Sequence, residues 1–366
     1  MARDVIVIGG GVIGCSIAWR LAQSGLKVAL FERDRVGCEA SRAAAGMLSL
    51  QGEAQAPGPF FDLCLRSRSM YRAFAEELTE ASGIDVEYKD EGTLFVVLGG
   101  ENEVQRTKWA AWQLEAGLRL EHVSANQIHK IEPAVTKSAP RAIFLPDEHQ
   151  VENRLVMDAL EVAMERAGVE LIEGAAVTAL TTARGKVTGV VSAGQRFDAG
   201  AVIVAAGSWS SELLAPLGMH VKVIPARGQM VALKGEICPI SRVIHSSRVY
   251  VVPRHDGRVL IGATVEYAGF EKAVTAEGIS HLLTAAIEVV PQLKEFEIVE
   301  SWSGLRPDTI DHLPIIGTSG IENLWLSTGH FRNGILLAPI TAAMIAMSVE
   351  QGRVSDLLTP FGIERF

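Results

Sequence analysis

The pattern of apolar and polar positions at the start of the chain predicts a β-turn-α-β unit. Residues 5–8 form a short apolar run of the kind found in strands buried on both faces of a parallel sheet. Glycines within residues 9–14 interrupt this run, and residues 15–24 then follow a helical spacing that ends at Gly25. Residues 28–32 predict the second strand.

Five later segments have the periodicity of helices. Residues 61–82 place Leu63, Met70, Phe74 and Leu78 on one stripe, as an amphipathic helix requires. The other predicted helices are residues 103–116, 153–167, 279–290 and 335–349, the second of these with Asn153 as N-cap and Gly168 at its end.

Several segments between these helices predict strands. They are residues 93–98, 176–181, 187–192 and 201–205, with a hairpin turn at Arg184-Gly185. Residues 221–233 and 249–262 alternate or run apolar like strands of a larger antiparallel sheet. Because nucleotide-binding elements occur at the start, middle and end of the chain, two interwoven lobes are expected rather than two successive domains.

Composition and charge narrow the function. The 366 residues are 48% hydrophobic and 21% charged, which favours a folded protein with a large core. A net charge of −9 disfavours a nucleic-acid partner, because such binding depends on neutralising phosphates. The four cysteines form no CxxC pair, so no metal site is expected. Absence of a signal-peptide pattern, and an apolar stretch at 336–347 too short to span a bilayer, predict a cytoplasmic protein without a membrane span.

The glycine-rich turn is the first candidate binding site. Gly9, Gly11 and Gly14 match G-x-G-x-x-G, which allows a tight turn, close approach of a pyrophosphate, and close helix packing. Glu32 lies 18 residues beyond Gly14, where an acidic side chain binds ribose hydroxyls and disfavours NADP. The turn alone leaves FAD and NAD open, and the small residues of 37–49 fit either a backbone beside a flat ligand or the start of an alanine-rich helix.

Four segments resemble the glycine oxidases of the D-amino-acid oxidase family: SRAAAGML at 41–48, VIVAAGSW at 202–209, SGLRP at 303–307 and GHFRNGILLAP at 329–339. The resemblance implies an α/β (mixed α+β) fold in which a Rossmann-like FAD-binding lobe is interwoven with a substrate-binding lobe on a large antiparallel sheet. The expected FAD-binding domain comprises residues 1–83, 148–218 and 300–366, and the substrate-binding domain comprises residues 84–147 and 219–299.

The resemblance also implies the residues that contact FAD, held without a covalent bond since no cysteine lies beyond Cys238. The α-helix starting near Gly334 is expected to point its N-terminus at the flavin. The full expected set is Gly9, Gly11, Val12, Ile13, Gly14, Glu32, Arg33, Ala40, Ser41, Ala45, Gly46, Met47, Val177, Gly207, His330, Phe331, Arg332, Asn333, Gly334, Ile335 and Leu336.

The substrate site follows from the same resemblance. Arg306 matches the family's carboxylate-binding arginine and Tyr250 a tyrosine whose hydroxyl reaches the same carboxylate. Arg332 lies where the family places the substrate amine near a backbone carbonyl, which leaves a structural role open for its side chain, and Met47 is also expected to bind the substrate. Arg248 and Val265 depart from the family's histidine and methionine; Arg248 either favours a larger or acidic substrate or points to solvent. No side-chain acid or base is expected, and His330 is expected to support the cofactor loop.

The activity implied is oxidation of glycine, sarcosine, D-alanine or D-proline by hydride transfer to FAD, with molecular oxygen as acceptor and hydrogen peroxide as product. In the family, the glycine imine also feeds thiamin synthesis, and homo-oligomers such as tetramers are expected. Three alternatives remain: a dehydrogenase with a non-oxygen acceptor, an RNA-modifying flavoprotein, which the acidic charge disfavours, and a flavin-binding module without catalysis, which Arg306 with Tyr250 disfavours.

Overall fold

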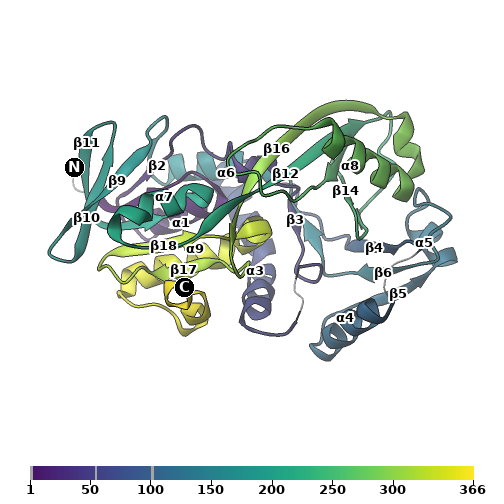
Figure 1. Ribbon diagram of the computed structural model, residues 1–366, viewed down its shortest axis with the longest axis horizontal. Coiled ribbons are helices and arrows are strands. Elements are labelled where there is room, and N and C mark those ends of the chain that lie inside the picture. Colours follow the sequence, from purple (N-terminus) through teal and green to yellow (C-terminus); the bar gives the residue numbers. More distant parts are fainter. Residues whose placement is uncertain (1–2, 54–55, 100–102) are drawn as a thin grey trace.

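The computed structural model describes residues 3–53, 56–99 and 103–366 as two lobes, each built on an eight-stranded sheet (Figure 1). In the first sheet the strand order is β17-β18-β11-β1-β2-β8, and β10 and β9 continue from β11. Its strands are β1 (Arg3–Ile8), β2 (Val28–Phe31), β8 (Glu170–Ile172), β9 (Val177–Ala183), β10 (Lys186–Ser192), β11 (Gln195–Val204), β17 (Ile315–Thr318) and β18 (Leu324–Thr328).

Strand β1 lies at the centre of this sheet and is parallel to both neighbours, β2 and β11. Its residues alternate between two cores, with Val5 and Val7 facing a cluster of helices and Ile6 and Ile8 facing the β9–β10 hairpin and α7 (Ser210–Leu214). This explains the uninterrupted apolar run in the sequence, since both faces of the strand are buried.

Four helices cover the first of these faces: α1 (Val12–Gln23), α3 (Pro59–Ser82), α6 (Asn153–Arg166) and α9 (Gly334–Gln351). Residues 331–351, which include α9, are long and apolar enough to cross a membrane by length and composition, but 67% of the most apolar window is buried inside the fold. Helix α9 packs on α1 and α3, so its apolar surface is explained as that of a core helix.

The second sheet has the order β16-β12-β15-β14-β13-β4-β6-β5. Its strands are β4 (Thr93–Val97), β5 (Glu121–Ser124), β6 (Arg141–Leu145), β12 (Val223–Lys234), β13 (Val243–His245), β14 (Tyr250–Pro253), β15 (Arg258–Gly262) and β16 (Glu297–Thr309). All neighbours are antiparallel except β13 with β4. Helix α8 (Ala276–Val289) packs against β12 and β15.

Shorter elements complete the fold. They are α2 (Ala40–Ala43), α4 (Glu103–Glu115), α5 (Ala125–Ile131), the two-stranded sheet β3 (Met47–Leu48) with β7 (His149–Gln150), and the 3-10 helices η1 (Gly207–Trp209), η2 (Ala215–Leu217), η3 (Pro291–Glu295), η4 (Phe331–Asn333), η5 (Asp356–Phe361) and η6 (Ile363–Arg365). Helices α4 and α5 lie beside β4–β6 at the end of the second lobe (Figure 1).

The expected fold class is confirmed, with three differences in detail. Asn153 is not the N-cap of α6, because Glu152 takes that place and accepts a hydrogen bond from the backbone N–H of Arg154. Residues 249–262 form two strands, β14 and β15, rather than one. Strand β16 pairs with β12 from Glu297 to Thr309, so the proposed domain division at residue 300 cuts a strand of the second sheet, and we propose placing it after Thr309.

Candidate active site

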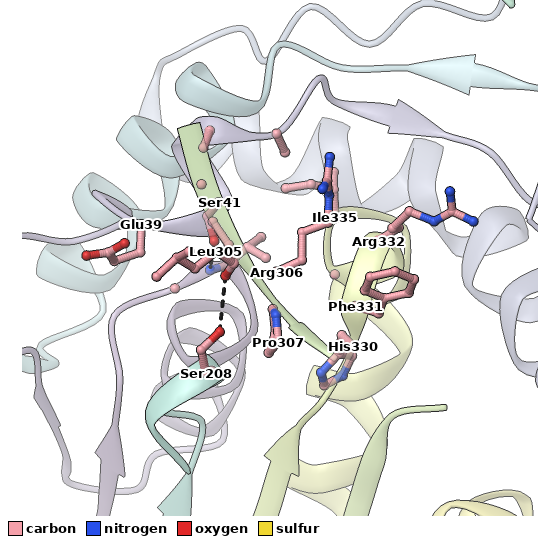
Figure 2. A pocket seen from close by; sticks show the side chains of 18 of the residues that line it. Glu39, Ser41, Ser208, Leu305, Arg306, Pro307, His330, Phe331, Arg332 and Ile335 are labelled. Atoms are coloured by element: carbon pink, nitrogen blue, oxygen red, sulfur yellow. Dashed lines mark hydrogen bonds between the residues drawn. The ribbon is translucent and has the colours of Figure 1, made fainter. Parts of the chain in front are cut away.

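A cavity of about 620 Å³ lies where the two sheets meet. One end is formed by the carboxyl ends of β1 and β2, where doubly wound folds bind their ligands. The other end is formed by β12, β14 and β16 of the second sheet. Figure 2 shows Ser41 and Glu39 on one side of this cavity, Phe331 and Arg332 on the opposite side, and the strand that carries Arg306 between them. The volume is in the range of ligand pockets, about 300–1,000 Å³.

The glycines of the turn after β1 have different neighbours. A Cβ on Gly9 would lie 2.4 Å from the carbonyl oxygen of Ala205, and one on Gly14 would lie 2.0 Å from that of Gly9. Gly11 differs, because the nearest protein atom to its Cβ position is Ser41 Oγ at 3.4 Å. Protein packing therefore requires glycine at positions 9 and 14, whereas at position 11 it leaves space beside the cavity wall for a ligand.

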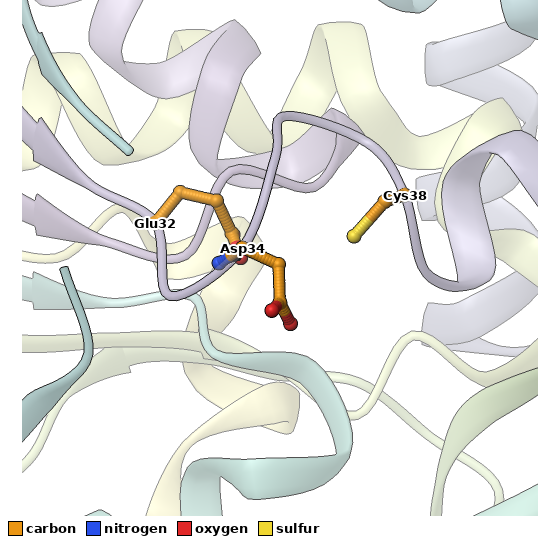
Figure 3. Close-up of side chains that lie close together, drawn as sticks. All are labelled: Glu32, Asp34 and Cys38. Carbon is orange, nitrogen blue, oxygen red and sulfur yellow. Dashed lines mark hydrogen bonds between the residues drawn. The ribbon is translucent and has the colours of Figure 1, made fainter. Parts of the chain in front are cut away.

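Glu32 occupies the end of β2 with both carboxylate oxygens engaged. Oε2 accepts from the N–H of Gly10 at 2.7 Å and Oε1 from the N–H of Asp34 at 2.9 Å. These hydrogen bonds connect the end of β2 to the glycine turn and fix the orientation of the carboxylate at the cavity wall. Figure 3 shows Glu32 with Asp34 and Cys38, whose ligand atoms lie within 4.8 Å of one another. Since Glu32 is held by backbone N–H groups and lines the cavity, we propose that it binds a ribose there rather than a metal ion.

The segment from Ser41 to Met47 is fixed from both lobes. Ser41 Oγ accepts from the N–H of Val12 at 2.9 Å, and the Asn153 amide donates to the carbonyl of Ser41 at 2.8 Å. Buried Arg254 of the second sheet donates to the carbonyl of Ala45 at 2.7 Å. This is why Asn153 is buried at the start of α6: its amide holds the cavity wall.

The loop before α9 forms the facing wall. Asn333 precedes the helix without a side-chain capping bond, so the first N–H groups of α9 remain available beside the cavity residues Gly334 and Ile335. His330 is buried and its Nε2 lies 3.2 Å from Thr341 Oγ1. Burial lowers the pKa of His330 to about 3, so this imidazole is neutral and supports the loop.

Arg306 and Tyr250 meet at the second-lobe end. The Arg306 guanidinium donates to the carbonyl of Thr264 at 3.1 Å and passes over Gly228, where a Cβ would lie 2.1 Å from it. Tyr250 lies over Gly262, with its hydroxyl 2.5 Å from the Cβ position there. Burial raises the pKa of the Tyr250 hydroxyl, while the charge of Arg306 and its hydrogen bond to that hydroxyl oppose the rise. A planar cation and a phenol thus lie together, as a carboxylate site requires.

Glu53 is a cavity residue that the sequence analysis did not find. Its Oε2 lies 2.8 Å from the guanidinium of Arg332. Burial raises the pKa of Glu53, and the charges of Arg332 and Arg306 oppose this rise. No local signal marks Glu53, because it lies in an irregular loop after β3. Arg306 and Tyr250, by contrast, were expected from the family resemblance of their segments.

The two departures from the family pattern lie at the mouth. Arg248 is half exposed and forms an ion pair with Glu288 of α8 at 2.5 Å, so its charge is directed toward the surface. Val265 lines the cavity and is 45% exposed. The surface pairing favours the solvent-facing interpretation of Arg248 over a role in binding an acidic substrate.

The structure brings nearly all the expected site residues to this one cavity. Gly14 and Leu336 do not line it: Gly14 packs beneath the turn, and the carbonyl of Leu336 accepts from Ser67 in the helical core. The residues that do line it are Gly9, Gly11, Val12, Ile13, Glu32, Arg33, Ala40, Ser41, Ala45, Gly46, Met47, Val177, Gly207, Arg248, Tyr250, Val265, Arg306, His330, Phe331, Arg332, Asn333, Gly334 and Ile335.

Comparison with known proteins places the chain in a family. The sequence model of the FAD dependent oxidoreductase family matches residues 4–347, and the chain belongs to this family. Glycine oxidase from Geobacillus kaustophilus is 34% identical over 99% of this chain and 97% of its own length. The crystal structure of glycine oxidase from Geobacillus kaustophilus superposes with a TM-score of 0.95, covering 100% of this chain and 99% of that one at 33% identity.

A second group of relatives is longer. The bifunctional protein ThiO/ThiG of Synechocystis sp. is 38% identical over 99% of this chain, which covers 54% of that protein. The chain thus spans about half the length of the first curated relatives it matches.

FAD is the cofactor, and the residues present fit it. The space at Gly11 admits a pyrophosphate, and the alanines and glycine at 43–46 leave room for a flat ring. Within the described part of the chain, the buried hydroxyl of Ser327 lines the cavity without a hydrogen-bond partner, as expected where a ligand supplies one.

Proposed function

We propose that the protein oxidises glycine and other small amino acids or amines, namely sarcosine, D-alanine and D-proline. The observation that carries this proposal is the pairing of Arg306 with Tyr250 at the end of the cavity opposite the glycine turn. The nearly full-length similarity to glycine oxidases supports it.

The chain's own residues have three tasks in this reaction. Arg306 binds the substrate carboxylate through two parallel hydrogen bonds, and the Tyr250 hydroxyl donates a third. The N-terminus of α9 stabilises the negative charge that reduction adds to the cofactor. Bound FAD would supply the acceptor for the hydride that leaves the substrate Cα. Positioning does the rest, since the described cavity residues include no side chain that we assign as acid or base.

With oxygen as acceptor, the products are a 2-oxo acid, ammonia or an amine, and hydrogen peroxide. The longer relatives are named bifunctional, and this chain matches about half of their length. We propose that the imine formed from glycine is used in thiamin synthesis here too. We further propose a cytoplasmic homo-oligomer without a covalent flavin bond.

The test is an anaerobic absorbance spectrum of the holoenzyme before and after each of glycine, sarcosine, D-alanine and D-proline, followed by air. Bleaching by one of them and fast recovery with peroxide supports an oxidase. Slow recovery in air favours the dehydrogenase alternative. If none of the four bleaches the flavin, the proposed substrate class is wrong.

A further inference from the structure

Among the described residues at the substrate end of the cavity, the carboxylate of Glu53 lies beside the cations. Glu53 follows β3 and Arg332 lies in η4, and their side chains make a contact of 2.8 Å inside the cavity wall. The Glu53 side chain is 19% exposed and that of Arg332 is 43% exposed. The pair is therefore partly open to solvent, and Arg306, which lines the same cavity, is itself partly buried.

The two arginines at this end of the cavity have different kinds of partner. Arg306 donates to the neutral carbonyl of Thr264, whereas Arg332 contacts a carboxylate. Arg306 and Arg332 both act electrostatically on Glu53, and all three act on the Tyr250 hydroxyl, so the four groups share one space. Two guanidinium groups and one carboxylate leave a single positive charge, which matches a single substrate carboxylate.

We propose that Glu53 is a specificity-determining residue that restricts this site to substrates with one carboxylate. It neutralises Arg332 and repels a second carboxylate at the mouth, while Arg306 binds the first. This inference rests on the proposed function, because it concerns which amino acids reach the same site. Rejection of the wrong substrate through like charge is a common source of specificity.

Solvent exposure limits the size of the effect. A charge pair near the surface is screened by water and salt, which reduces its energy well below that of an enclosed pair. We therefore expect discrimination of about tenfold from Glu53 rather than complete exclusion, since tenfold corresponds to about 1.4 kcal/mol.

Two substrate pairs that differ by one carboxylate test the proposal: sarcosine against iminodiacetate, and D-alanine against D-aspartate. Glu53→Gln keeps the side-chain shape and removes the charge. We expect the ratio of kcat/KM for the dicarboxylate to that for the monocarboxylate to rise about tenfold, and Glu53→Asp to leave it within about twofold of wild type. Glu77→Gln, which removes the same charge from the remote Arg20–Glu77 ion pair, should not change it.

A binding measurement separates this inference from the proposed function. Absorbance titration of the oxidised holoenzyme with acetate and with malonate needs no turnover. Glu53→Gln should lower the malonate Kd about tenfold and leave that of acetate nearly unchanged. Equal malonate affinity in wild type and variant would overturn the role of Glu53 even if all four amino acids are oxidised. Failure of all four as substrates would overturn the proposed function and leave the titration informative.

Arg332→Gln provides a variant with the opposite expectation, which is useful if Glu53→Gln does not fold. It leaves the Glu53 charge unpaired at the mouth, so the malonate Kd should rise about tenfold. An unchanged or lower malonate Kd in this variant would contradict the proposal.

Discussion

Two strand glycines create the space for the substrate-binding side chains. Gly228 of β12 lies under the Arg306 guanidinium, and Gly262 of β15 lies under the Tyr250 ring. Any side chain at these positions would occupy the volume that Arg306 and Tyr250 fill. Glycine inside a strand costs stability, so its presence here is explained by the close approach of these two groups.

Gly228→Ala should displace Arg306 because the new methyl group would lie 2.1 Å from its guanidinium. We expect the KM for glycine to rise about tenfold or more with FAD still bound, as for Arg306→Ala. Steady-state kinetics of both single variants and the double variant would check this. Additive losses in the double variant would show that Gly228 does not act through Arg306.

The buried imidazole of His330 should make the stability of the protein depend on pH. Its folded pKa of about 3 lies below the ordinary value of 6.5, so below pH 6.5 the unfolded chain binds a proton that the folded chain does not. Stability should therefore decline as pH falls from about 6.5 toward 3, by at most about 1.4 kcal/mol per pH unit from this group. Thermal unfolding of wild type and His330→Gln would measure it. An equally steep decline in both proteins would exclude His330 as its cause.

At the scale of elements, the turn between β1 and α1 contains some glycines that the fold requires and one that leaves space for a ligand. Gly9 and Gly14 are required by backbone contacts within the protein, whereas Gly11 borders open space. The three glycines of one motif are therefore needed for different reasons: packing within the protein at positions 9 and 14, and space for a ligand at position 11.

Gly11→Ala should fold normally, since the nearest protein atom is 3.4 Å from the new Cβ, but it should weaken FAD binding about tenfold or more by filling the pyrophosphate space. Gly14→Ala is the matched comparison and should lower stability by about 1–3 kcal/mol through its 2.0 Å clash. Flavin-release titration and thermal unfolding check the two effects. Equal FAD affinity in Gly11→Ala and wild type would contradict this division.

The sequence predicted elements with strong periodicity well. Residues 5–8, 61–82 and 335–349 all became the expected strand or helices, because each buries a regular apolar face. It missed Asn153, whose amide forms tertiary bonds to the Ser41 segment instead of capping α6, and Glu53, whose position depends on an irregular loop. Contacts between distant segments carry no local periodicity, so the pairing of Glu53 with Arg332 required the structure.

For the whole molecule, the segment at 263–275 connects the lobes across the cofactor cavity. The Phe270 ring packs against Trp209 in a tilted arrangement, with ring centroids 5.3 Å apart, and Lys272 Nζ donates to Glu39 at 3.0 Å. Trp209 also lies under the Arg33 guanidinium, 3.6 Å from its ring centroid. Because Trp209 and Glu39 line the cavity, this segment contacts one of its walls, and we propose that it helps to retain the cofactor.

Phe270→Ala should speed FAD release several-fold, since aromatic pairs contribute about 0.5–1.5 kcal/mol beyond their buried area. The rate of flavin release after dilution into apo-flavoprotein scavenger would measure this. Val274→Ala, on the same segment and 38% exposed, is the control. Similar release rates for both variants would indicate that the segment does not retain the cofactor.

The residues that line the cavity extend along the sequence from Ile8 to Ile335. During synthesis on the ribosome, the first β-turn-α unit emerges early, but the wall before α9 emerges only after the strands of both large sheets. A nascent chain therefore has no complete flavin site until the residues up to Ile335 have emerged. A chain stopped before the loop that precedes α9 would lack one wall of the cavity, so stable capture of the cofactor has to follow synthesis of that loop.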